Sequence, residues 1–515
     1  MSGIQAIFRT TEPSRRMSHI AASALIGAAL TGCAVGPYLP PPTIPQPARY
    51  TQKALPQKIG GQQRLRWSDQ AYARWWTTFA SPGLDRIVDQ VLQHNPDLAA
   101  DRASLARAKA LVAAAQGGLM PSIGANLGAD RSKALRTGAD GGSQYKVPGN
   151  LYSLILGTVS VQYNPDVFGG QEDLVHAAKA RAEVQSAQLR QAQIFVIAAT
   201  MNAAIDGAQA QAQLRAAQHI ARADERLLTL LRAEYKLGYQ NLQNVEQQQA
   251  ITDAAQARLA PLEASLSAAR HALDALRGSM PNRPVNMPSL KRLHLPQNIP
   301  VVVPSALLQT RPDIQAARAE VRVASANADV ATANLYPQLD ITGSIGKAAQ
   351  TGTLFFNPVS TLWSLGAALV APIYEGGALT AERQAAMDAY HEAANRYRAT
   401  VFDAFRQTAD ALRALQSAHT AYKHSKASAK AAAKALKLAV AKYRDGVVDY
   451  NALLNAEIAY QEDTVAAIKA RSTLYLDNVA LFVAMGEGPD LQVKPHEDGN
   501  QRPDTQVQHH PGNRT

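Results

Sequence analysis

The chain contains one sequence pattern twice, and this internal repeat restricts its fold more than any other feature. Asn95-Pro96-Asp97-Leu98 is matched by Arg311-Pro312-Asp313-Ile314, 216 residues further on. Three more pairs follow in the same order at offsets of 216, 207 and 208 residues: Leu119-Met120-Pro121 with Leu335-Tyr336-Pro337, Phe168-Gly169-Gly170 with Glu375-Gly376-Gly377, and Tyr235-Lys236-Leu237-Gly238 with Tyr443-Arg444-Asp445-Gly446. This order and spacing indicate that both halves fold into the same unit.

Each unit is predicted to contain a helix, two strands and a hairpin of long helices. Pro96 and Pro312 suit the first position of a helix. Alternating residues after Pro121 and Pro337 favour strands, and Gly238 and Gly446 favour turns between helices. The expected bounds are a first repeat over 71–280 with strands within 122–163 and a helical hairpin over 171–279, a linker over 281–311, and a second repeat over 312–488 with strands within 338–372 and a hairpin over 378–485. The return helices are expected over 242–279 and 450–485.

The predicted strands imply an oligomer. Each has about 10–12 residues, close to the roughly 9–11 that cross a bilayer as a tilted strand. Four amphipathic strands cannot close a barrel, and an open edge in lipid leaves backbone groups unpaired at a cost of several kcal/mol each. Other copies must therefore complete the sheet, and three chains with four strands each give twelve.

The first 33 residues have the pattern of a secretion signal that ends in a lipid-attachment site. Arg9, Arg15 and Arg16 precede a short apolar stretch over 20–30, which is too short to span a membrane as a helix. Leu30-Thr31-Gly32-Cys33 then resembles a bacterial lipobox. The predicted organisation is a signal peptide over 1–32, lipid attachment at Cys33 and a Pro-rich extended tether over 33–70. Cys33 is the single cysteine, which excludes an internal disulfide.

Together these motifs resemble the outer-membrane factors of the TolC/OprM type, in particular the lipoprotein branch attached to tripartite efflux pumps. The residues that carry the resemblance extend from Trp75 to about Gly488: Asn95-Pro96-Asp97-Leu98, Pro121, Asp166-Val167-Phe168-Gly169, Leu307 to Ile314, and Pro372 to Gly377. The resemblance implies a mixed α and β fold, in which a homotrimer forms a 12-stranded transmembrane β-barrel continuous with a long periplasmic α-helical barrel. It also implies a passive exit channel that docks with a periplasmic adaptor and an inner-membrane efflux transporter.

The same resemblance implies where the functional residues lie. In this family the inner helices narrow at the periplasmic end, where acidic side chains form a ring around the trimer axis. Asp449, Asn455 and Glu457 are the candidates here, although the family often has Asp at the position of Asn455. Asp449 could instead be a solvated helix cap. The expected adaptor-facing hairpin tips contain Gly238, Tyr239, Gly446 and Val447.

No catalytic, metal or cofactor motif is recognisable in the sequence. Gly169-Gly170 and Gly376-Gly377 are expected to form bends between strand and helix rather than a phosphate-binding loop. His509-His510 lie in a polar tail over 489–515 that is predicted to be disordered. The net charge of +11 arises from Lys and Arg scattered among Asp and Glu, so nucleic acid is not an expected partner. Trp75, Trp76 and Phe79 are expected to pack against the helices.

These observations favour an outer-membrane exit channel of a tripartite efflux pump, lipid-anchored and extending into the periplasm, over three alternatives. The exit duct of a type I protein-secretion system is the alternative within the channel class. A lipid-anchored stalk or adhesin would not need bilayer-length strands. A tethered periplasmic enzyme would need a cluster of acid, base or nucleophile residues. The sequence does not identify the cargo.

Overall fold

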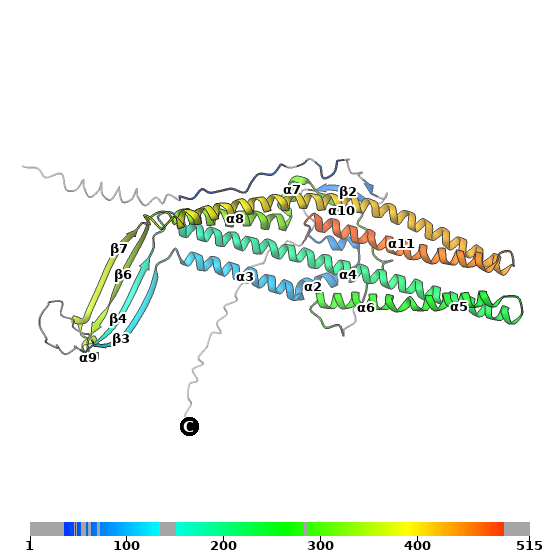
Figure 1. Cartoon of the computed structure of the whole chain (residues 1–515), viewed down its shortest axis with the longest axis horizontal. Coiled ribbons are helices and arrows are strands. Elements are labelled where there is room, and N and C mark those ends of the chain that lie inside the picture. The colour runs from blue at the N-terminus through cyan, green and yellow to red at the C-terminus, as the bar shows by residue number, and fades with distance from the viewer. Residues whose placement is uncertain are drawn as a thin grey trace, which may run out of the picture.

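The computed structural model describes residues 35–45, 47, 49–52, 58–59, 63–68, 73–133, 151–282 and 286–488. The predicted signal peptide 1–32, the lipid-attachment residue Cys33, the tail 489–515 and His509-His510 lie outside these residues. The helices form a long bundle, and a four-stranded sheet extends from one end of it (Figure 1). Within the described ranges, no helix combines the length and the apolar character that crossing a membrane requires.

Both repeats contain the predicted series of elements. The first consists of α3 (Pro96–Gly117), β3 (Ser122–Lys133), β4 (Leu151–Tyr163), α4 (Gly170–Lys236), α5 (Leu242–Ala257) and α6 (Leu259–Leu276). The second consists of α8 (Pro312–Ala333), β6 (Gln338–Ala349), β7 (Thr361–Val370), α10 (Ala378–Arg444) and α11 (Tyr450–Ala484), with the short α9 (Gly352–Phe355) and η2 (Pro358–Ser360) between the strands. The helices α4 and α10 have 67 residues each, so each is about 100 Å long.

The residues at the helix starts explain why these elements begin where they do. Pro96 and Pro312 occupy the first turns of α3 and α8, as predicted. The Asn95 Oδ1 accepts a hydrogen bond of 2.9 Å from the Leu98 N–H and so caps α3. Gly169 and Gly377 precede α4 and α10 with φ of 83° and 85°, a left-handed conformation that favours glycine. The prediction of strand-to-helix bends at these glycines is confirmed.

The return helix of the first repeat differs from the prediction. A single helix over 242–279 was expected, but the helix is interrupted at Arg258 and continues as α6 to Leu276. Pro261 explains the interruption, because it has no N–H to donate to the Ala257 carbonyl and its ring crowds that carbonyl. The second repeat has no proline at this place, and α11 is continuous.

The segments predicted as a tether and a linker are also more ordered than expected. From the tether, β1 (Lys58–Ile59) and β2 (Gln63–Ser68) form a three-stranded sheet with β5 (Asn298–Val302) of the linker, in which β2 and β5 run parallel. Helix α7 (Pro304–Thr310) follows β5. Further upstream, the Tyr38 N–H donates to Asp329 Oδ1 at 3.0 Å, and the Tyr390 hydroxyl donates to the Pro40 carbonyl at 2.8 Å. The described part of 33–70 therefore packs on the helices, because it finds strand partners and polar side chains there.

The main core lies midway along the bundle, where η1 (Trp75–Phe79) and α2 (Pro82–His94) pack on the long helices. Trp75, Trp76 and Phe79 are all buried, which confirms the predicted packing role. The Trp75 ring stacks on Phe482 with centroids 5.0 Å apart, and its Nε1 donates to the Glu487 carbonyl at 3.0 Å. The N-terminal segment is thus fixed to the end of α11.

Arg311 joins three helices beside this core. Its Nη1 donates to the Ala484 carbonyl of α11 at 2.6 Å, and its Nη2 donates to Gln407 Oε1 of α10 at 2.9 Å. The same guanidinium forms an ion pair with Asp313 at 2.6 Å. Charge-assisted hydrogen bonds of this kind are among the stronger ones in proteins. The Arg-Pro-Asp motif therefore starts α8 and also joins it to the end of α11 and to the middle of α10.

We expect Trp75→Ala to lower the free energy of unfolding by about 3–5 kcal/mol, because it removes a fully buried ring and leaves a cavity. Denaturant unfolding followed by far-UV circular dichroism measures the change. Trp67→Ala is the matched control, because Trp67 is 53% exposed. Equal losses in the two variants would contradict the assignment of Trp75 to the core.

Candidate functional site

The four-stranded sheet is the first candidate site. Its order is β3-β4-β6-β7, and each neighbouring pair is antiparallel. The register places Ala125, Val159, Ile345 and Trp363 side by side across the four strands. Residues directly opposite one another point to the same face of a sheet, so whole rows of side chains share one face.

The two faces of this sheet differ in polarity. One face carries Ile123, Ala125, Leu127, Ala129, Ile155, Val159, Val161, Leu339, Ile341, Ile345, Trp363, Leu365, Ala367 and Leu369. The other carries most of the polar side chains: Ser122, Asn126, Asp130, Thr158, Ser160, Gln162, Gln338, Asp340, Thr342, Ser344 and Ser364. On this face the hydroxyls of Ser344 and Ser364 are 2.8 Å apart and share a hydrogen bond. The two faces therefore differ in overall character, although the first also carries Arg131, Lys133 and Lys347 and the second carries Leu154, Leu156, Leu362 and Val370.

The apolar face is exposed in the single chain, and Leu127 and Trp363 are 77% and 75% exposed. A soluble monomer rarely exposes an apolar surface of this extent, so this face belongs against a partner or lipid. Among the described residues, β3 and β7 each have a strand neighbour on one side only. The backbone groups on their outer sides are available to pair with another strand.

The hairpin tips at the opposite end of the molecule are the second candidate site (Figure 1). At the end of α4 the Gly238 N–H donates to the Tyr235 carbonyl and the Tyr239 N–H to the Glu234 carbonyl, at 3.0 and 2.9 Å. Gly446 and Val447 repeat this pattern at the end of α10. Both glycines have positive φ, as this Schellman-type turn requires.

The three predicted aperture residues occupy different environments. Asp449 is exposed and caps α11, because its Oδ1 accepts from the Ala452 N–H at 2.9 Å. Asn455 is exposed on the same helix. Glu457 is 7% exposed and points into the protomer, so the structure does not bring it together with Asp449 and Asn455 on one exposed face.

Glu457 of α11 instead faces Asp224 of α4, which is fully buried. Burial, and then the nearby Asp224 charge, raise the pKa of Glu457 to about 8. Burial likewise raises the pKa of Asp224, which Arg258 partly offsets. Two carboxyl groups so placed repel when both are ionised, so the pair holds a proton at neutral pH.

Two tyrosines connect the hairpins of the two repeats next to this pair. The Tyr450 hydroxyl of α11 donates to Gln248 Oε1 of α5 at 2.6 Å, and the Tyr443 hydroxyl of α10 donates to Glu234 Oε2 of α4 at 3.1 Å. Burial raises the pKa of Tyr450 to about 12, so its hydroxyl stays a donor. A small apolar cluster surrounds these contacts: Leu228, Leu231, Val245, Tyr450 and Leu454.

Asp224 was not among the predicted site residues, although its position in the sequence carries a signal. Ala221, Leu228 and Leu231 are buried, and Asp224 falls between them at the three- and four-residue spacing of one helix face. Glu457 falls in the same way between the buried Leu454 and Gln461. A carboxylate inside such a spacing predicts a buried acid. Among the described residues, no group of three or more His, Cys, Asp or Glu could hold a metal ion.

Comparison with known proteins places these features in one family. The family model described as outer membrane efflux protein matches residues 87–279 and 303–487. The chain is 28% identical to the pyoverdine export outer membrane protein OpmQ of Pseudomonas putida, over 81% of this chain and 88% of that protein. It is 24% identical to the cation efflux system protein CusC of Escherichia coli, over 90% and 98%. The solved outer-membrane channel OprN matches with a TM-score of 0.80 and 24% identity, over 88% and 99%.

We expect the hairpin tips of the native protein to lose stability progressively as pH rises from about 4.5 to about 8, and Glu457→Gln to reduce this dependence. Glu457 binds its proton more readily in the packed tip than in water, so packing is favoured at low pH and weakened once the proton is lost. Amide hydrogen exchange of 450–461, corrected for intrinsic rates, measures the effect across this pH range. Glu462→Gln, an exposed neighbour, is the control. Equal pH dependence in Glu457→Gln and the native protein would contradict the role of the pair.

Proposed function

The chain belongs to the outer membrane efflux protein family, and we propose that it is the outer-membrane exit channel of a tripartite efflux pump. In this role it passively conducts small-molecule cargo that an inner-membrane transporter and a periplasmic adaptor deliver. The observation that supports the proposal most directly is the exposed sheet, which has one apolar face, one largely polar face and two open edges.

The open edges support a homotrimer. In the proposed assembly, β7 of each chain pairs with β3 of the next, and three chains close a barrel of twelve strands in the outer membrane. The apolar face then contacts lipid and the polar face lines the passage. Closure satisfies the backbone groups that an isolated sheet would leave unpaired in lipid. A non-conducting stalk would not account for a sheet whose exposed faces differ in this way.

The helical end of the molecule supports docking to an adaptor. Tyr239 is 82% exposed, and Gly238, Gly446 and Val447 are exposed beside it at the two tips. We assign these four residues to the adaptor-facing surface. Asp449 and Asn455 are the proposed aperture residues, because both side chains are exposed near a tip. Glu457 contributes through its buried contact with Asp224 rather than by lining the aperture.

Purified protein is expected to behave as three chains in detergent and to form cation-selective channels in planar bilayers. A ring of Asp449 carboxylates attracts cations, so Asp449→Asn should lower the cation selectivity while its Oδ1 still caps α11. Asn455→Asp should raise the selectivity, because it adds a carboxylate close by. The reversal potential in a salt gradient measures both changes.

Asp253→Asn is the matched control, an exposed carboxylate on α5. A monomer without conductance under any condition would refute the exit channel. A trimeric channel whose selectivity follows Asp253 rather than Asp449 would keep the channel and refute the aperture assignment.

Cys33→Ser is expected to abolish metabolic labelling of the protein with palmitate, because this residue is the proposed acylation site. Mass spectrometry of the mature N-terminus provides an independent measurement. In the native protein, the first residue is expected to be acylated Cys33. Equal labelling of the native and variant proteins would place the lipid elsewhere.

A further inference from the structure

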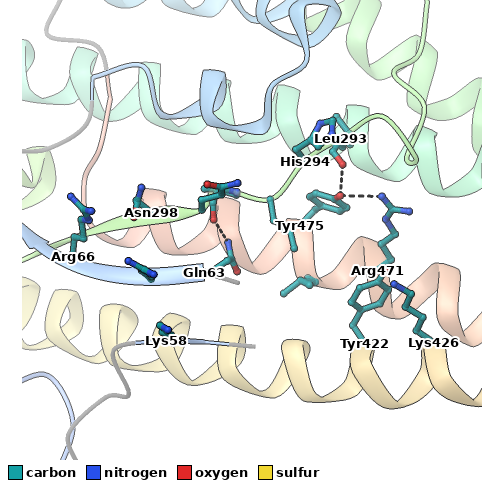
Figure 2. Close-up of a pocket in the computed structure, with 15 residues that line it drawn as sticks. Lys58, Gln63, Arg66, Leu293, His294, Asn298, Tyr422, Lys426, Arg471 and Tyr475 are labelled. Atoms are coloured by element: carbon teal, nitrogen blue, oxygen red, sulfur yellow. Dashed lines mark hydrogen bonds between the residues drawn. The ribbon is translucent and has the colours of Figure 1, made fainter. Parts of the chain in front are cut away.

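We propose that a cavity between the small sheet and the helices α10 and α11 binds a soluble polyanion that carries phosphate or carboxylate groups. The cavity has a volume of about 770 Å³ and lies under β1, β2 and the segment before β5 (Figure 2). Its position midway along the helices separates it from both candidate sites above. Nothing in the proposed conduction of cargo requires this cavity.

The charge of the lining points to an anionic ligand. Among the described residues, the lining contains five side chains with a full positive charge, Lys58, Arg64, Arg66, Lys426 and Arg471, together with His294 and no Asp or Glu. None of these five forms an ion pair within the described part of the chain. The whole chain has 52 Lys and Arg against 41 Asp and Glu. A lining with five cations and no acidic residue therefore does not follow from the composition of the chain.

A second cavity of about 470 Å³ extends the same charge. It shares Tyr422, Lys426 and Arg471 with the first and adds Arg215 and Lys291, and its described lining also lacks Asp and Glu. The two neighbouring cavities are therefore lined by seven cations in total. Arg66 and Lys58 lie toward one end of the view in Figure 2, and Lys426 and Arg471 lie toward the other. A ligand with several anionic groups along its length fits this distribution.

Two tyrosines hold the cations at the right-hand end in place. The Arg471 guanidinium lies 5.8 Å from the Tyr475 ring centroid and donates to the Tyr475 hydroxyl at 3.4 Å. That hydroxyl itself donates to the Leu293 carbonyl at 2.6 Å (Figure 2). The Lys426 ammonium lies 5.8 Å from the Tyr422 ring centroid. Most guanidinium donors of Arg471 remain available, and their planar fork matches the oxygens of phosphate and carboxylate.

The position of the cavity favours a soluble ligand over a lipid. Tyr422 follows the start of α10 at Ala378 by 44 residues, so it lies about 65 Å along the helix from the strands. If those strands cross the outer membrane as proposed, its headgroups are too far away to reach the cavity. The exclusion of a lipid ligand therefore rests on the proposed function. The proposal that the cavity binds an anion does not rest on it.

Isothermal titration of the full-length protein in neutral detergent with inorganic tripolyphosphate, and in parallel with citrate, tests the proposal. The native protein is expected to bind at least one of them, and the double variant Lys426→Gln/Arg471→Gln to bind it at least about tenfold more weakly. Lys434→Gln/Lys437→Gln removes the same charge from exposed positions of α10 outside both linings and should change affinity by less than about twofold. Thermal unfolding identifies variants that fail to fold, in which case Arg471→Lys replaces the double variant.

Equal loss of affinity in the two double variants, or no binding of either anion by the native protein, would overturn the proposal. Preferential binding to vesicles of phosphatidylglycerol over phosphatidylcholine through Lys426 and Arg471, without binding of the soluble anions, would also overturn it in favour of a lipid headgroup. Channel conductance is measured on the same variants and should be unchanged. A protein that binds tripolyphosphate but does not conduct would refute the exit channel and leave the anion site standing.

Discussion

Backbone hydrogen bonding is the constraint on which the rest of this architecture depends. An N–H or C=O group that leaves water without a partner costs free energy comparable to that of a lost hydrogen bond. The inner strands β4 and β6 satisfy their groups within the chain, whereas β3 and β7 do so on one side only. The apolar face that spans all four strands would draw the sheet out of water, but the open edges oppose this in a single chain. In the proposed trimer, association of copies would resolve this conflict.

The helical part is subject to a different constraint. Its backbone groups form hydrogen bonds within each helix, so side-chain packing has to decide how the helices are arranged. Midway along the bundle, a large apolar core and the Arg311 contacts hold α8, α10 and α11 together. Near the tips only a small apolar cluster remains, and polar groups such as Glu457, Asp224 and Tyr450 occupy buried positions. Buried polar pairs contribute little net stability but penalise a wrong register. The packing of the tips therefore depends more on polar contacts, and less on apolar burial, than the packing at the middle of the bundle.

The repeat and its local signals predicted the course of the chain well, because they depend on neighbouring residues. Pro96, Pro312, Gly238 and Gly446 mark the starts and ends of helices through their own backbone preferences. Alternation predicted strands that the structure places at 122–133, 151–163, 338–349 and 361–370. The small sheet was not predictable in this way, since β2 pairs with β5 more than 200 residues away and neither strand has a long alternating pattern. The contact of Glu457 with Asp224 was not predictable from local signals for a related reason: Asp224 is distant in sequence, and only the spacing of buried neighbours indicated it.

Pro261 breaks the equivalence of the two repeats. One return helix is interrupted at Arg258, and its counterpart α11 is continuous over 35 residues. Three such chains around an axis would present six hairpins but only threefold symmetry, because hairpins with an interrupted and with a continuous return helix alternate. A ring of docking subunits would then contact two different kinds of groove between neighbouring hairpins, in alternation around the axis. Six identical copies of a partner could not all make the same contacts, so that partner would need either two binding modes or a stoichiometry of three.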